Sequence, residues 1–339
     1  MGSVYTVQSI NTAHSSFHIV QKHSLEKLFE AMYHGKVAFA DFESVPVDQS
    51  FVRHQFRKQG KAREVISPNQ KLRAFHEFIR LFLLDFLPIN AATVFSYRKG
   101  VSAYDAVVKH AASKHFFLCD IADFFPSVKR HRIRQTILAG KNASPVEDVD
   151  RWLDRILDLV SVDDCLPMGF STSPAISNAA LLSFDNAVQE HCVSNGLTYT
   201  RYSDDVLVSA PDQTSLNGIE EALSTLLAVH LDGELTFHGG KSRLLHIGSK
   251  IKLLGMVLLP NGAVSVDASV KSEIEVLIHF YIRDKAKFAD CVNGDPQKAE
   301  ARLAGLLNYV NTVDQSYLHK LRKKFGATVV DLFLHRSFG

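Results

Sequence analysis

The stretch YTRYSDDVLVSA, residues 199–210, places two aspartates side by side between two apolar segments. The residues on both sides have the composition of β-strands, and the Ser-Asp-Asp between them suits a tight turn. Successive residues of a regular strand point to opposite faces, so Asp204 and Asp205 can face the same point only at such a turn. Two carboxylates this close make each other harder to ionise unless a cation neutralises them. The hairpin therefore raises the question of a cation site.

The segments before and after this hairpin predict an α+β fold with an antiparallel sheet. In chain order we expect a strand, a helix, two strands, a helix and a final strand, over residues 116–121, 173–196, 199–202, 206–208, 216–227 and 235–237. Ser173 is placed to cap the first of these helices, with Pro174 in its first turn. This order is that of the split βαβ, ferredoxin-like arrangement.

In such a sheet the first strand lies beside the hairpin, so Asp120 at its end should meet Asp204 and Asp205. Three converging carboxylates favour a hard cation such as Mg²⁺, which prefers oxygen ligands. Two such ions about 4 Å apart can activate an attacking hydroxyl and stabilise the leaving oxygen in phosphoryl transfer. An isolated Asp-Asp pair is more often only a polar turn, so this interpretation depends on the neighbouring motifs.

The composition of the whole chain excludes several classes of protein. Of its 339 residues 46% are apolar and 22% are charged, and it contains no uncharged apolar run of about 18 residues, so we expect a cytoplasmic globular protein rather than a membrane protein. Its net charge is only +2, but basic residues concentrate at 52–65, 129–134 and 319–324. These clusters favour a polyanionic partner. Two amphipathic stripes after residue 263 predict a helical bundle.

Three motifs stand in the order in which reverse transcriptases have them: DIADFF at 120–125, LPMGFSTSPAISN at 166–178 and YSDD at 202–205. Over about residues 50–335 the chain resembles bacterial reverse transcriptases of the retron, defence-associated and group II intron-like kind. The resemblance implies a right-hand polymerase with a ferredoxin-like palm, α-rich fingers and a helical thumb. The implied units are an N-terminal extension at 1–50, fingers at 51–115 with 129–165, a palm at 116–128 and 166–262, and a thumb at 263–339.

The resemblance also assigns the catalytic metal site. Asp120, Asp204 and Asp205 match the metal-binding aspartates of the family, and Ile121 would add its backbone carbonyl. Two Mg²⁺ ions are the implied cofactors, with Mn²⁺ as the substitute.

For the incoming nucleotide the resemblance implies six binding residues: Lys61, Arg63, Asp123, Phe125, Gly169 and Lys241. Guanidinium suits the triphosphate, and the lysine of GGKSRLL is a candidate proton donor to the pyrophosphate. The ring of Phe125 would clash with a 2′-hydroxyl, which predicts a preference for deoxynucleotides. Met168 stands where many members of the family have a glutamine that contacts the nucleotide.

For the template and primer the resemblance implies Tyr202, the primer-grip segment KLLGMVL at 252–258 and the helices of the thumb. The residues expected to contact the duplex are Tyr202, Leu254, Gly255, Lys320, Arg322, Lys323 and Lys324. Cationic side chains on the thumb suit the phosphates of an RNA–DNA duplex.

The function implied by the resemblance is RNA-directed DNA synthesis. We expect a bacterial cytoplasmic enzyme that copies a structured cognate non-coding RNA into single-stranded DNA (msDNA) from dNTPs, in a retron-type anti-phage system, with an effector or toxin protein as a candidate partner. Two alternatives stay open: a defence-associated reverse transcriptase that makes untemplated or repeat DNA, and a catalytically silent scaffold that binds RNA and an effector. An RNA-dependent RNA polymerase is disfavoured by Phe125.

Overall fold

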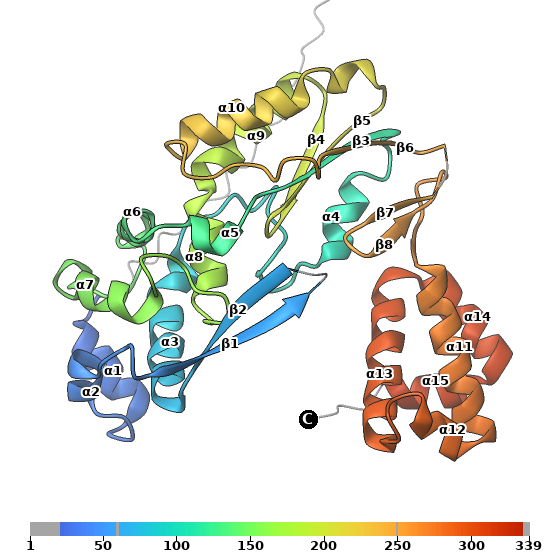
Figure 1. The fold of residues 1–339 in the computed structure, drawn as a ribbon, viewed down its shortest axis with the longest axis horizontal. Coiled ribbons are helices and arrows are strands. Elements are labelled where there is room, and N and C mark those ends of the chain that lie inside the picture. Colours follow the sequence, from blue (N-terminus) through green and yellow to red (C-terminus); the bar gives the residue numbers. More distant parts are fainter. Residues whose placement is uncertain (1–20, 59–60, 249, 335–339) are drawn as a thin grey trace, which may run out of the picture.

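The computed structural model describes residues 21–58, 61–248 and 250–334, apart from the side chains of Lys58 and Lys61. The ends of the expected N-terminal extension and thumb, residues 1–20 and 335–339, lie outside the described residues. A four-stranded sheet forms the centre, with N-terminal helices and C-terminal helices below it on opposite sides in Figure 1. Within the described ranges no helix is both long and apolar enough to cross a membrane.

The central sheet has the strand order of the ferredoxin-like arrangement. It consists of β3 (His115–Asp120), β4 (Thr198–Tyr202), β5 (Asp205–Ala210) and β6 (Arg243–His246) in the antiparallel order β4-β5-β3-β6. The predicted order of elements is therefore confirmed, but the final strand was placed wrongly. It runs over 243–246, and in the predicted segment 235–237 only Phe237 forms an isolated bridge, to Ile121.

Both faces of this sheet are buried along its central strands β3 and β5, which explains why these strands are apolar at consecutive positions, whereas the edge strand β6 is largely exposed. Phe117 and Cys119 of β3 belong to one hydrophobic core, whereas Phe116 of the same strand and Leu207 of β5 belong to a second. The side chains of a strand alternate between its two faces. The sheet therefore joins the two cores and fixes the units on either side of it.

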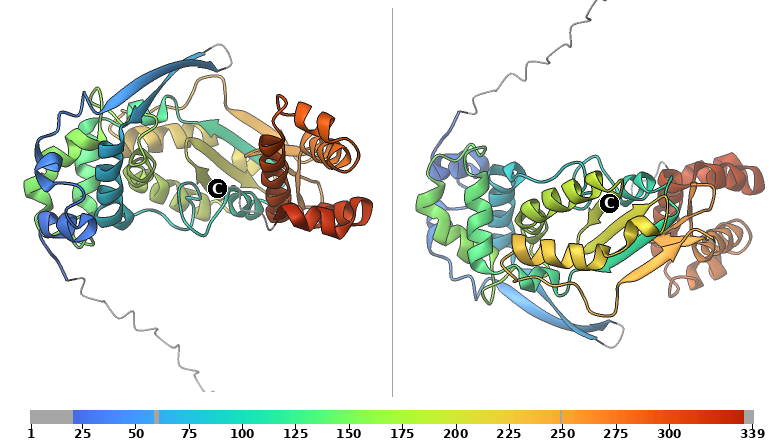
Figure 2. Two further views of the ribbon diagram at one scale, coloured as in Figure 1. Left: turned by 90° about the horizontal axis from the view of Figure 1, so that it is seen from below. Right: turned by 90° about the horizontal axis from the view of Figure 1, so that it is seen from above.

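Three helices cover the face of the sheet that contacts the first core: α8 (Ser173–Ala180), α9 (Leu182–Ser194) and α10 (Ile219–His230), the last preceded by a 3₁₀ turn, η2 (Thr214–Leu216). Figure 2 shows α9 and α10 lying along the sheet. The single helix predicted over 173–196 is interrupted at Leu181. Ser173 is the first helical residue instead of the cap, and its Oγ donates to the carbonyl of Pro167 at 2.7 Å.

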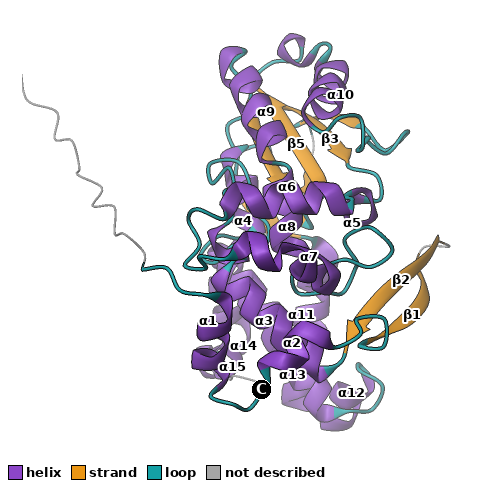
Figure 3. Cartoon of the chain, turned by 90° about the vertical axis from the view of Figure 1, so that its left-hand side faces the viewer, coloured by secondary structure: helices purple, strands orange, loops and turns teal. Residues whose placement is uncertain are grey.

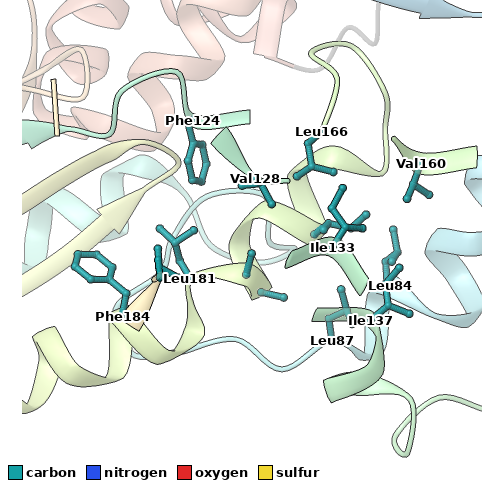
Figure 4. Packing of buried hydrophobic residues seen from close by; sticks show 14 of the residues in the cluster. Leu84, Leu87, Phe124, Val128, Ile133, Ile137, Val160, Leu166, Leu181 and Phe184 are labelled. Carbon is teal, nitrogen blue, oxygen red and sulfur yellow. The ribbon is translucent and has the colours of Figure 1, made fainter. Parts of the chain in front are cut away.

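The first core continues into the N-terminal part of the chain. Its helices are α1 (Leu25–Tyr33), α2 (Phe39–Ser44), α3 (Gln70–Phe82), η1 (Leu84–Phe86), α5 (Phe124–Ser127), α6 (Arg130–Gly140) and α7 (Val149–Val160). Figure 4 shows side chains of this core, among them Phe124, Val128, Ile133, Leu166 and Leu181, packed between these helices and the α8–α9 pair. Residues 25–44 thus share a core with the expected fingers.

A long hairpin projects from this helical part, as Figure 3 shows. It consists of β1 (Phe51–Lys58) and β2 (Lys61–Pro68), paired from Phe51↔Pro68 to Lys58↔Lys61. The basic cluster predicted at 52–65 lies on this hairpin.

The last part of the chain forms a small sheet and a helical bundle around the second core. The sheet holds β7 (Ile251–Leu253), β8 (Met256–Leu258) and β9 (Val264–Val266), and the bundle holds α11 (Ala268–Arg283), α12 (Lys285–Asp290), α13 (Pro296–Val313), α14 (Gln315–Phe325) and α15 (Ala327–Leu334). Four of these helices begin at an aspartate whose side chain accepts backbone N–H groups: Asp267, Asp284, Asp295 and Asp314. The predicted helical bundle is confirmed.

A buried histidine connects the sheet to the helix α4 (Ala103–Lys109). The ring nitrogens of His110 lie 2.6 Å from Ser209 Oγ and 2.8 Å from Thr200 Oγ1, one residue on each of β5 and β4. Burial lowers the pKa of His110 from 6.5 to about 3, and it lowers that of the buried His76 to about 4. Both imidazoles are therefore neutral in the folded protein at pH 7.

This burial predicts a loss of stability in mild acid. Below about pH 6.5 the unfolded chain binds a proton at each of these histidines that the folded chain does not bind, so the free energy of unfolding falls with decreasing pH. Each contributes a slope of about 1.4 kcal/mol per pH unit. His110→Gln keeps a donor and an acceptor but does not titrate. In denaturant titrations it is expected to reduce the slope of unfolding free energy against pH by about 1.4 kcal/mol per pH unit between pH 6.5 and 5. The same change at exposed His319 serves as the control, and an unchanged slope in His110→Gln would contradict the assignment.

Candidate active site

The sheet brings the three predicted aspartates to one end of the central strands. Asp120, the last residue of β3, is the register partner of Asp205, the first residue of β5. Asp204 lies in the turn between β4 and β5, and its carbonyl accepts the N–H of Ile121 at 3.0 Å. Asp120 and Asp205, 85 positions apart in the sequence, are therefore held together by backbone pairing, as the ferredoxin-like order predicts.

The turn that carries Asp204 has a strained backbone and is held by side chains from outside the hairpin. Ser203 has φ of 60°, in the left-handed region that residues other than glycine seldom adopt. Its N–H donates to Ser96 Oγ at 2.8 Å, and its Oγ lies 2.9 Å from the hydroxyl of Tyr97. The segment 93–97 thus supports the turn through hydrogen bonds. The sequence pattern did not reveal this support.

Below the turn lies a fully buried ion pair between Arg201 of β4 and Asp185 of α9. Arg201 Nε donates to Asp185 Oδ1 at 2.8 Å and its Nη2 donates to Asp185 Oδ2 at 2.6 Å, with both side chains completely excluded from solvent. The remaining Nη1 donates to the carbonyl of Ser203 at 3.0 Å and to Asn178 Oδ1 at 3.2 Å. The hydroxyl of Tyr199 also donates to Asp185. Arg201 therefore connects helices α8 and α9 directly to the turn.

The carboxylates at this end of the sheet are only partly compensated by positive charge. Burial, together with the carboxylates of Asp204 and Asp120, raises the pKa of Asp205 to about 6. Burial also raises the pKa of Asp204, to which the charge of Asp120 adds. Two cations act on these carboxylates: Lys241 Nζ donates to Asp120 Oδ2 at 2.5 Å, and the charge of Arg243 acts to lower the pKa of Asp205. The site therefore favours the binding of additional positive charge.

We tested whether these residues suit a metal ion. As they stand, no three His, Cys, Asp or Glu side chains within residues 21–58, 61–248 and 250–334 are arranged closely enough to hold one. The chemistry of the donors does fit, because carboxylates are the ligands that hard divalent cations prefer, and burial and the neighbouring carboxylates raise the pKa values of Asp204 and Asp205.

A cavity of about 490 Å³ opens next to the carboxylates, between the sheet and the β1–β2 hairpin. Its walls hold most of the residues predicted to bind a nucleotide, including Arg63, Asp123, Phe125 and Lys241, and also Asp120, Asp204 and Met168. Asp123 has a left-handed backbone, with φ of 43°. The side chain of Lys61 lies outside the described part of the structure.

Gly169 has a packing role in this wall. A Cβ at this position would lie 2.4 Å from the carbonyl oxygen of Ile66, and its φ of +110° also disfavours any other residue. Next to it, the N–H of Ile66 donates to the carbonyl of Met168 at 2.8 Å. Arg53 of β1 adds a two-point ion pair to Asp163, with N–O distances of 2.7 and 3.0 Å. The hairpin is thus attached to the loop at 163–169.

A second cavity, of about 290 Å³, collects the residues predicted to contact the primer. Tyr202, Leu254 and Gly255 line it together with Asp205. Leu254 and Gly255 form the turn between β7 and β8, and both have positive φ, as two-residue hairpins of this type require.

The structure does not bring the predicted cations of α14 to the carboxylates, and it separates them into two pairs. Lys320 and Lys323 border a shallow hollow on the surface of the bundle. Arg322 forms an ion pair with Asp331 at 2.8 Å, and Lys324 forms one with Glu275 at 2.7 Å, so both are engaged within the bundle.

A ferredoxin-like sheet with three acidic residues at one end, flanked by an α-rich unit with a basic hairpin and by a separate helical bundle, defines the class of right-hand polymerases. Within that class, residues 55–258 match the family described as reverse transcriptase (RNA-dependent DNA polymerase). The chain belongs to the reverse transcriptase family.

Curated relatives of the chain include reverse transcriptases of retrons. The Retron Mx162 reverse transcriptase of Myxococcus xanthus is 23% identical over 277 residues, which cover 76% of this chain but only 56% of the relative. The Retron Ec73 reverse transcriptase of Escherichia coli is 23% identical over 283 residues, covering 79% of this chain and 84% of the relative. Among solved structures, telomerase from Candida albicans aligns with 93% of this chain and 61% of its own, at 14% identity and a TM-score of 0.45.

The buried ion pair predicts a large effect of a small substitution. Asp185→Asn removes one charge and leaves Arg201 buried without a counter-ion, so we expect the free energy of unfolding to fall by about 3–5 kcal/mol in denaturant titrations. Glu273→Gln is the matched control, because Glu273 makes the same two-point contact with Arg302 on the surface of the bundle, at 2.7 and 3.0 Å. That change should cost less than about 1 kcal/mol. If both substitutions lower the free energy of unfolding equally, the buried pair stabilises the fold no more than the surface pair does.

Proposed function

We propose that the chain is an RNA-directed DNA polymerase whose catalytic carboxylates are Asp120, Asp204 and Asp205. The observation that carries the proposal is the position of these side chains at paired strand ends, beside a cavity that also holds Arg63 and Lys241. Membership of the reverse transcriptase family supports the choice of reaction. The raised pKa values of Asp204 and Asp205, caused first by burial and then by the neighbouring carboxylates, support a role for an added cation.

The proposed cofactors are two Mg²⁺ ions, with Mn²⁺ as the substitute. Asp120, Asp204 and Asp205, with the carbonyl of Ile121, are the residues that would hold them. When bound, such ions would make the primer hydroxyl more acidic and would neutralise charge on the reacting phosphates. Lys241, which pairs with Asp120 in the structure, lies where it can turn to the leaving pyrophosphate and donate a proton.

The other residues of the cavity have positioning roles in the proposal. Arg63, with Lys61, binds the triphosphate, and Asp123 lies in the same wall. The ring of Phe125 excludes the 2′-hydroxyl of a ribonucleotide. Gly169 contributes by letting the hairpin approach the loop closely.

The substrates outside the cavity are an RNA template and a growing RNA–DNA duplex. Tyr202, Leu254 and Gly255 lie where they can hold the primer end next to Asp205. On the bundle we assign the phosphate contacts to Lys320 and Lys323, because Arg322 and Lys324 are engaged in ion pairs.

The units of the proposed polymerase follow the boundaries expected from the sequence, with one adjustment. We assign fingers to 51–115 with 129–165, the palm to 116–128 and 166–267, and the thumb from α11 onward. The palm is extended past 262 because β9 pairs with β8. Residues 1–50 remain the N-terminal extension, of which 25–44 pack onto the fingers.

In its biology, the proposed enzyme copies a structured cognate non-coding RNA into single-stranded DNA, as in a retron, within an anti-phage system of the bacterial cytoplasm that includes an effector protein. Similarity to the retron reverse transcriptases of Myxococcus xanthus and Escherichia coli supports the assignment to a retron.

The decisive test replaces two of the carboxylates. The double variant Asp204→Asn and Asp205→Asn is expected to lower dNTP incorporation on an RNA template by at least about 100-fold, because two of the carboxylates that would hold the cations are lost. Asp290→Asn, on the exposed surface of the bundle, is the control. Expressed in bacteria, the double variant should also lose the RNA-linked single-stranded DNA that co-purifies with the wild type. Unchanged incorporation would overturn the proposal.

The role of Phe125 predicts a change in sugar selection. Phe125→Ala removes a half-buried ring from the wall of the cavity and opens space beside the incoming sugar. We expect the ratio of ribonucleotide to deoxynucleotide incorporation, as kcat/KM, to rise by about tenfold or more. Phe125→Tyr keeps the ring and should keep the wild-type ratio. If alanine leaves the ratio unchanged, Phe125 does not select the sugar.

A further inference from the structure

Tyr97 is exposed in a backbone conformation that aromatic residues avoid. Its φ is 55°, in the left-handed region, and 49% of its surface is accessible to solvent. Burial of the ring therefore compensates for only part of the backbone strain. The segment is held instead by polar contacts, since Arg98 donates to the carbonyl of Ala91 at 2.9 Å and Tyr97 hydrogen-bonds Ser203. A strained residue at a surface is a reason to look for function.

The ring of Tyr97 lies where two cavities meet. It lines the cavity of the carboxylates and also a neighbouring cavity of about 430 Å³ on the other side. The neighbouring cavity is basic: Arg80, Arg98 and Lys99 line it against a single carboxylate, that of Asp85. Asp85 pairs with Arg80 at 3.1 Å, which leaves the positive charges of Arg98 and Lys99 in excess.

An exposed aromatic ring beside a positively charged groove is the combination by which proteins bind single-stranded nucleic acid. The ring offers a face to an unpaired base, and the cations contact the phosphates beyond it. Because the hydroxyl of Tyr97 is anchored to Ser203, the ring is fixed next to Asp204.

We propose that Tyr97 stacks on an unpaired base of the template strand as that strand approaches the carboxylates, and that the basic cavity receives the phosphates of the following nucleotides. This inference rests on the proposed function, because it takes the single strand to be the template. It assigns Lys99, whose side chain is exposed, to a phosphate of that strand.

The test compares two ligands on the full chain. The first is a DNA primer annealed to an RNA strand that extends past it as an unpaired 5′ overhang, and the second is the same duplex with blunt ends. Tyr97→Ala is expected to weaken binding of the overhang ligand, measured by fluorescence anisotropy, by about tenfold and to leave the blunt duplex unchanged. Tyr97→Phe keeps the ring and loses only the bond to Ser203, so it should bind the overhang ligand more tightly than Tyr97→Ala does and the blunt duplex as the wild type does.

Two further variants separate stacking from a structural role. Tyr97→Gly relieves the positive φ and removes the ring, so it should fold at least as stably as Tyr97→Ala and yet show the same loss of overhang binding. Lys99→Ala should make binding of the overhang ligand less dependent on salt. The slope of the logarithm of the binding constant against the logarithm of the salt concentration should fall by the amount expected for about one phosphate contact. Lys109→Ala, an exposed lysine of α4 outside the cavity, is the control and should not.

The outcomes are distinct for the two proposals. Wild-type overhang binding by Tyr97→Ala, or an equal loss for both ligands, would overturn the stacking role. The wild type could incorporate no nucleotide while Tyr97→Ala still loses binding of the overhang ligand alone. In that case the stacking site stands and the polymerase proposal falls.

Discussion

The buried ion pair between Arg201 and Asp185 is the constraint on which the arrangement of the site depends. Removing two charges from water costs several kcal/mol for each ion, and the cost is recovered only when the geometry is good and each polar atom has a partner. Here the guanidinium meets that condition through Asp185, Asn178 and the carbonyl of Ser203. Any displacement of the turn at Ser203 would break one of these bonds, and the buried Arg201 has no access to solvent that could replace it. The turn that carries Asp204 is therefore held more firmly than its two strands alone would hold it.

This rigidity allows the fold to tolerate an unfavourable cluster of charge. Asp204 and Asp205 are both made harder to ionise by burial, and the nearby cations Lys241 and Arg243 offset this only in part. Because the turn is fixed from below by Arg201 and from the side by Ser96, Asp204 stays next to the paired ends of β3 and β5.

The sequence was sufficient to predict the elements whose signals are local. The apolar runs of β3 and β5, the Ser-Asp-Asp turn and the amphipathic stripes of the bundle each follow from neighbouring residues, and together they predicted the ferredoxin-like order and the meeting of Asp120 with Asp205. What failed depends on distant partners. The final strand was assigned to 235–237 on composition, but pairing with β3 selects 243–246. Arg201 looked like an ordinary strand residue, because nothing local indicates that Asp185 lies beneath it.

The position of the β1–β2 hairpin also depends on a contact between residues far apart in the sequence. Here the decisive feature is that Gly169 has no side chain. Arg63 contributes to the cavity because β2 approaches the loop at 163–169 closely enough for Ile66 to donate to Met168. That approach is open only to glycine at 169, since a Cβ there would lie 2.4 Å from the carbonyl of Ile66. A sequence motif with Met168 and Gly169 side by side therefore contains two different kinds of information: the first residue lines the cavity with its side chain, and the second lets the wall of that cavity close.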